Sequence, residues 1–87
     1  MTISESLFKA LCLKFESEIA QSIVTLEIYF NNSVGIGEHP QHLEEMDKLI
    51  EQIASNEDKL SCLKKNFTKY SSNTASNVSI NGNISMN

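Results

Sequence analysis

The stretch "NNSVGIGEHPQHLEE", Asn31–Glu45, decides how this chain of 87 residues folds. It contains both histidines, the only proline and two of the three glycines. Glycine supplies the positive φ angles that a chain reversal needs, and proline fits the first position of a helix because its missing N–H would have no partner there. The stretch therefore predicts a bend, with a helix before it and a helix beginning at Pro40.

The segment before the bend has the apolar spacing of a helix over residues 3–31. Its large apolar residues recur mostly in steps of three and four, which is typical of one helix face. They are Leu7, Phe8, Leu11, Phe15, Ile19, Ile23, Leu26 and Phe30. Thr2 and Glu5 fit a capping box at the start, and Asn31 or Asn32 is expected to end the helix in the left-handed conformation.

The segment after the bend predicts a second helix over residues 40–70. Steps of three and four alternate along it in a coiled-coil seam, formed by Met46, Leu49, Ile53, Asn56, Leu60, Leu63, Phe67 and Tyr70. Acidic residues near its start and lysines near its end complement the helix dipole. Asn56 is the polar member of the seam, and two interpretations of it stay open: a register-setting contact between the helices, or a surface residue at the edge of the hairpin.

Two helices of similar length joined by a loop at residues 32–39 must run antiparallel, because a short loop returns the chain along the first helix. The predicted fold is therefore all-α, a long helical hairpin over residues 1–70. The tail, residues 71–87, carries no charged or aromatic side chain. Its composition is typical of disorder, whereas the alternation of apolar and polar residues from Val78 to Met86 predicts a short β-hairpin or a strand that docks on a neighbour.

Several functions are not expected from the composition. The chain has seven lysines, no arginine and a net charge of −4, so nucleic acid is not an expected partner. No apolar run approaches the roughly 18 residues of a membrane span, and the first residues lack a basic leader, so synthesis in the cytoplasm is expected. Cys12 and Cys62 are expected to be reduced, and no base lies near either thiol. We therefore expect no enzyme activity, no cofactor and no small-molecule substrate.

A metal site is the alternative interpretation of the bend. His39, His42 and Glu45 are spaced in steps of three and could supply ligands for zinc or another divalent ion. A helix start explains more of the same residues, because Pro40 and the acidic residues after it suit the first turn of a helix. These three residues are therefore weak metal candidates.

The helices predict a protein that contacts another protein, by self-association or with a different partner. Two amphipathic helices cover only part of each other's apolar faces, so large side chains of a lone hairpin stay exposed to water. The residues expected at interfaces are Phe8, Phe15, Ile19, Leu26, Phe30, Met46, Ile53, Leu60, Leu63, Phe67, Val78, Ile80, Ile84 and Met86.

The run "YFNNSVGIGEHPQHLEEMDKLIEQIASNEDKL" resembles short proteins of tailed bacteriophages, in particular T4-like and marine cyanophage relatives, in which a segment of the type NNxxGIGEHP joins two helices. The resemblance covers residues 27–67, and its most specific part is Gly35–Pro40. It implies a viral origin and a helical hairpin, and it transfers no catalytic residue. The expected function is a small virion-associated or accessory structural protein, made in the host cytoplasm. A regulatory adaptor that binds a host or phage enzyme is the alternative, besides the metal-binding protein.

Overall fold

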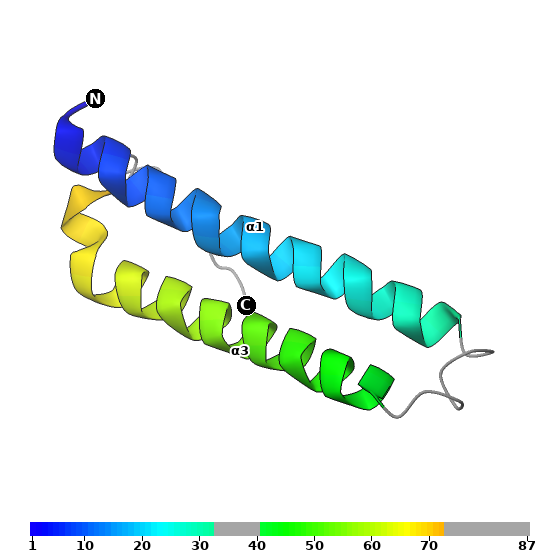
Figure 1. Ribbon diagram of the computed structural model, residues 1–87. Coiled ribbons are helices and arrows are strands. Elements are labelled where there is room, and N and C mark those ends of the chain that lie inside the picture. The colour runs from blue at the N-terminus through cyan, green and yellow to red at the C-terminus, as the bar shows by residue number, and fades with distance from the viewer. Residues whose placement is uncertain (33–40, 73–87) are drawn as a thin grey trace.

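The computed structural model describes residues 1–32 and 41–72, and these form an antiparallel helical hairpin (Figure 1). Helix α1 spans Ile3–Asn31, helix α3 spans Gln41–Phe67, and a 3-10 turn, η1, spans Thr68–Tyr70. Helices α1 and α3 pack along one another, which confirms the predicted all-α hairpin. Most of the expected loop and nearly all of the tail, including the predicted β-hairpin or docking strand, lie outside the described residues.

The start of α1 is held by the predicted capping box. The backbone N–H of Thr2 donates to Glu5 Oε1 at 2.9 Å, and the backbone N–H of Glu5 donates to Thr2 Oγ1 at 3.1 Å. Each bond satisfies an amide that has no partner within the helix.

The predicted end of α1 is wrong in its conformation. Asn32 has φ −114° and ψ 59°, outside the left-handed region. Its N–H is instead shared between the carbonyls of Ile28, at 3.0 Å, and Tyr29, at 3.3 Å. Shared hydrogen bonds of this kind are common at helix termini, so the chain leaves α1 without a left-handed residue at this position.

Replacing Thr2 with Ala should lower the free energy of unfolding by about 1 kcal/mol, because it leaves the amide of Glu5 without its acceptor. Urea denaturation followed by circular dichroism measures the change. Thr25→Ala is the matched control, since the Thr25 hydroxyl donates to the Gln21 carbonyl within the helix and caps nothing. Equal losses in the two variants would show that the capping box does not stabilise α1.

The second helix ends earlier than predicted. The expected α-helix over 40–70 stops at Phe67, whose φ of −130° and ψ of 22° leave the helical region. The last turn tightens into η1, and the N–H of Ser71 donates to the Thr68 carbonyl at 2.9 Å. Asn66 and Thr68 have low helix propensity, which favours this ending.

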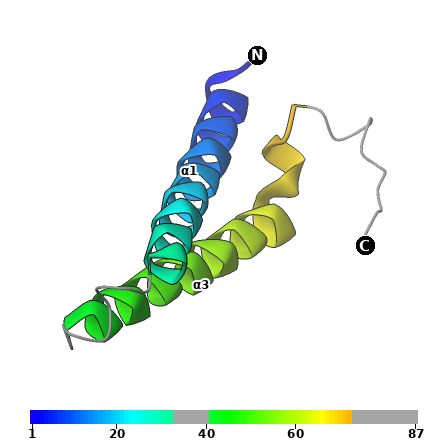
Figure 2. The ribbon, with the colours of Figure 1, turned by 90° about the vertical axis from the view of Figure 1, so that its right-hand side faces the viewer.

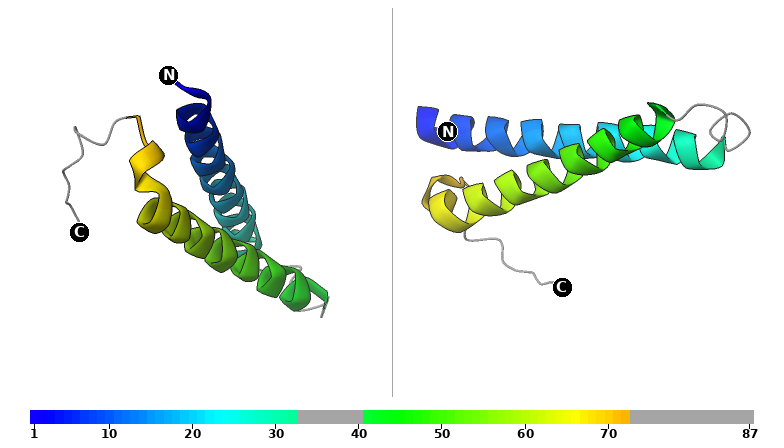
Figure 3. Two further views of the ribbon diagram at one scale, coloured as in Figure 1. Left: turned by 90° about the vertical axis from the view of Figure 1, so that its left-hand side faces the viewer. Right: turned by 60° about the horizontal axis from the view of Figure 1, so that its bottom comes forward.

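The helices meet along matching seams. The inward residues of both helices follow alternate steps of three and four. The two helices are inclined to one another rather than parallel (Figures 2 and 3). The inward residues of α1 are Phe8, Cys12, Phe15, Ile19, Ser22, Leu26 and Tyr29; those of α3 are His42, Met46, Leu49, Ile53, Asn56, Leu60 and Leu63. The most buried described residues are Asn56, 4% exposed, and Ser22 and Leu26, each 6% exposed. The most buried part of the hairpin therefore includes two polar residues besides Leu26.

The seam of α3 agrees with its predicted spacing from Met46 to Leu63, whereas Phe67 and Tyr70, its last two predicted members, are exposed. The apolar stripe expected for α1 is also wrong in part. Leu7, Leu11, Ile23 and Phe30 are exposed, while Cys12, Ser22 and Tyr29 face α3 in their place. A single partner helix covers only a narrow strip of α1, whereas the apolar residues of α1 occupy more than one side. The strip that faces α3 therefore does not contain all of the largest side chains of α1.

Candidate interaction surface

The structure divides the residues expected at interfaces into two groups. Most of them face the other helix inside the hairpin: Phe8, Phe15, Ile19, Leu26, Met46, Ile53, Leu60 and Leu63. Phe30 and Phe67 are exposed instead. Val78, Ile80, Ile84 and Met86 lie outside the described residues. Most of the residues expected to contact a partner protein therefore contact the other helix of the same chain. Apolar residues that remain exposed form the surfaces described below.

Asn56 is buried in the seam, so the interpretation of a surface residue at the edge is wrong. Its Nδ2 donates to the Gln52 carbonyl at 2.7 Å and approaches Gln52 Oε1 at 3.4 Å. These bonds stay within α3 and do not cross to α1. They satisfy the buried amide group, which would otherwise be costly to remove from water.

The described metal candidates have other neighbours. The His42 ring packs edge to face against Tyr29, with ring centroids 5.4 Å apart and an interplanar angle of 65°. Glu45 Oε2 lies 4.0 Å from Lys48 Nζ, and His39 lies outside the described residues. Within residues 1–32 and 41–72, the structure has no group of three or more His, Cys, Asp or Glu side chains placed to hold a metal ion.

The two thiols are free and differ in exposure. Cys62 is exposed, and Cys12 is half-buried in the seam. Burial raises the pKa of the Cys12 thiol, Lys64 opposes this rise, and Glu16 adds to it.

Iodoacetamide should therefore alkylate Cys62 faster than Cys12 in the native protein, because the reaction requires an accessible thiolate. Peptide mass spectrometry at short reaction times measures the ratio. In urea both thiols become exposed, and their rates should converge. A native Cys12 that reacts as fast as Cys62 would contradict its burial.

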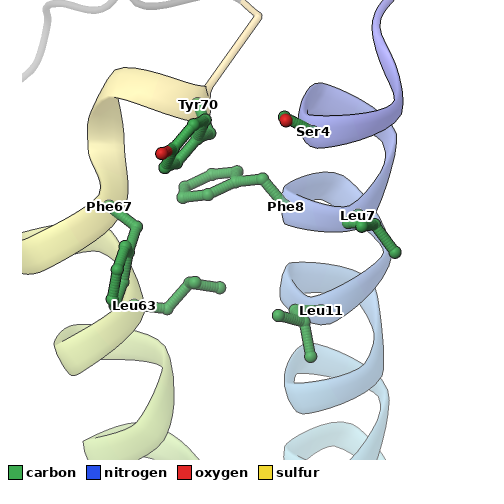
Figure 4. A pocket seen from close by; sticks show the side chains of 7 residues that line it. All are labelled: Ser4, Leu7, Phe8, Leu11, Leu63, Phe67 and Tyr70. Carbon is green, nitrogen blue, oxygen red and sulfur yellow. The ribbon is translucent and has the colours of Figure 1, made fainter.

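An apolar cleft lies at the open end of the hairpin, where α1 begins and α3 ends. Its volume is about 300 Å³, and no charged residue lines it. Phe8 and Leu11 point into it from α1, opposite Leu63, Phe67 and Tyr70 (Figure 4). The cleft could not be predicted from a continuous helix over residues 40–70. Tyr70 lines one side of the cleft, and its position depends on the 3-10 turn.

A second apolar surface is the side of α1 that faces away from α3. We call it the outer face, and its large apolar members are Ile3, Leu7, Val24 and Ile28. These side chains are between 55% and 78% exposed. Leu7 also lies at the rim of the apolar cleft, on the side of α1 away from α3 in Figure 4. α1 thus carries apolar residues both toward α3 and away from it. A helix that is apolar on all sides is typical of a position between two neighbours.

A third apolar surface, which we call the side patch, is formed by Ile23, Phe30, Leu43 and Ile50, all of them exposed. Each member directly follows an inward residue in sequence, and in an antiparallel pair such positions of the two helices lie on the same side of the seam. The patch occupies the half of the hairpin nearer the bend. The side patch can be found from the sequence once the inward residues of α1 are known, because each of its members directly follows an inward residue.

None of the described helices combines the length and apolar character needed to cross a membrane. No protein-family model matches the chain, and neither a curated protein nor a solved structure matches it. The resemblance of residues 27–67 to the phage proteins stays a prediction.

Proposed function

We propose that this chain is a non-enzymatic assembly protein, which acts by packing apolar helix faces against another protein chain. The observation that carries the proposal is the small amount of apolar burial. Leu26 is the one apolar residue of the described segments that is buried, and no described side chain is completely buried. Folding must offset the conformational entropy of the chain, and a small domain depends on apolar burial to do so.

The outer face of α1 supports the same proposal. Exposed apolar residues scattered singly are ordinary, but here they gather at both ends of the outer face of α1 and on the side patch. The exposed side of α3 differs, since charged residues predominate on it, with Glu44, Asp47, Glu51 and Lys65 among them. Apart from Leu43 and Ile50, the exposed apolar residues of the outer face and the side patch therefore lie on α1.

Under this proposal the chain is a small virion-associated or accessory structural protein, made in the host cytoplasm. The support is the phage resemblance of residues 27–67, together with a hairpin suited to repeated side-by-side packing. Mass spectrometry of purified particles tests it: many copies per particle are expected. Absence from particles would favour the regulatory adaptor instead.

Light scattering on the purified full chain tests assembly itself. We expect a mass above that of one chain, and a melting temperature that rises with protein concentration, because association stabilises the folded state by mass action. A single-chain mass and a constant melting temperature over about a hundredfold range of concentration would rule out self-association. If particles also lacked the chain, the assembly proposal would fail.

A further inference from the structure

We infer that the outer face of α1 binds α1 of a second copy of this chain, with the two helices antiparallel. The inference rests on the proposed function and names both the partner and the surface. The resulting assembly is a layer of four helices, with the two α1 helices in the middle and the charged α3 helices outside.

The positions along the outer face form a second seam, opposite the one that contacts α3. Its members alternate in steps of four and three, and all are exposed: Ile3, Leu7, Ala10, Lys14, Ser17, Gln21, Val24 and Ile28. Such a seam is the pattern that a helix presents to a partner helix. Its apolar members gather at the two ends, while its centre is polar.

This seam is complementary to itself when two copies run antiparallel. A two-fold axis near the centre places Ile3 opposite Ile28 of the second copy and Leu7 opposite Val24. Each of these pairs occurs twice, so all the large apolar side chains of the face meet apolar neighbours. Isologous contacts of this kind are typical of two-fold dimers.

The same pattern specifies the register. A shift by one heptad in one direction places Leu7 opposite Ser17, and a shift in the other direction places Val24 opposite Lys14. Each shift removes apolar contacts and brings polar side chains against apolar ones. The unshifted arrangement is the one that pairs both apolar ends.

Charge favours the antiparallel orientation over the parallel one. A parallel pair would place Lys14 opposite Lys14 of the second copy, which is unfavourable. In the antiparallel pair Lys14 lies opposite the uncharged Ser17 of the second copy, so the two lysines do not face one another.

A matched pair of variants of the full chain tests the surface. Val24→Glu places a carboxylate in the proposed contact, and Ile50→Glu places one on the side patch; the two positions are 55% and 52% exposed. Both variants should keep the helical signal of the wild type. Val24→Glu should raise the dissociation constant of the dimer by at least about 100-fold, since each dimer buries the change twice, and Ile50→Glu should change it by less than about threefold.

Disulfide trapping tests the orientation independently of those variants. In a background with Cys62→Ser, the double variant Leu7→Cys/Val24→Cys should form covalent dimers on mild oxidation. Val24→Cys alone should not, because the two Val24 positions lie roughly 25 Å apart along the antiparallel pair. Cys12 can stay, because it is half-buried and faces α3.

The other outcomes overturn the inference and identify what fails. Dissociation by Ile50→Glu alone would place the contact on the side patch and leave the assembly proposal standing. Covalent dimers from Val24→Cys alone would show a parallel pair. A wild-type chain that stays monomeric but is abundant in particles would refute pairing with a second copy, while supporting assembly with another protein.

Discussion

Replacing Asn56 with Asp is expected to reduce the free energy of unfolding by about 3 to 5 kcal/mol at pH 7, the largest effect of any single substitution considered. The change keeps the shape of the side chain but removes the donor to the Gln52 carbonyl, and it places a carboxylate beside that carbonyl oxygen. The site is 4% exposed, so water cannot solvate the new charge.

The loss in Asn56→Asp should depend on pH in a defined direction. Burial and the neighbouring carbonyl raise the pKa of the new carboxyl in the folded state above its unfolded value of about 3.9. The penalty is therefore smallest below pH 4, where the carboxyl is protonated in both states, and it grows as the pH rises through the folded-state pKa. Urea denaturation at pH 4 and pH 7, each referred to the wild type at the same pH, measures the trend.

Asn66→Asp is the matched control for this prediction. The Asn66 side chain makes the same kind of bond, from Nδ2 to the Cys62 carbonyl at 2.9 Å, but it is exposed. Its loss should stay below about 1 kcal/mol because water solvates the charge. Similar losses in the two variants would show that Asn56 is accessible to water in the folded protein.

Replacing Leu26 with Ala is expected to reduce the free energy of unfolding by about 2 to 4 kcal/mol, through lost apolar burial and the cavity left between the helices. Leu43→Ala is the control, since Leu43 is 67% exposed and its removal should change stability by no more than about 0.5 kcal/mol. Urea denaturation at low protein concentration measures both, so that association contributes little. A loss below about 1 kcal/mol for Leu26→Ala would mean that α1 and α3 separate easily there.

The hairpin could be predicted because its signals are local and agree with one another. The glycines and Pro40 interrupt two long stretches of helical spacing, and the antiparallel arrangement follows from the short connection. The capping box at Thr2 and Glu5 could also be read from two residues. The seam of α3 can be read from the sequence because charged residues predominate on the rest of that helix.

The inward face of α1 could not be predicted for the opposite reason. Apolar residues lie on several sides of α1, so periodicity alone does not fix which side turns toward α3. Ser22 is among the most buried of the described residues although it is small and polar, so hydrophobicity alone does not identify the inward face. The 3-10 turn at Thr68–Tyr70 could not be predicted from the spacing of apolar residues, because it depends on the backbone angles of Phe67, which leave the helical region.

The difference in polarity between the exposed sides of α1 and α3 affects the solubility of the whole molecule. The outer face of α1 carries exposed apolar residues, whereas charged residues predominate on the exposed side of α3. An unassembled hairpin is therefore an amphiphile some tens of ångströms long. We expect such a molecule to adsorb at the air–water interface. Salts that are excluded from protein surfaces, such as ammonium sulfate, should precipitate it because they strengthen the association of exposed apolar faces. Salting-out at low protein concentration is therefore a simple physical signature of the exposed edge of α1.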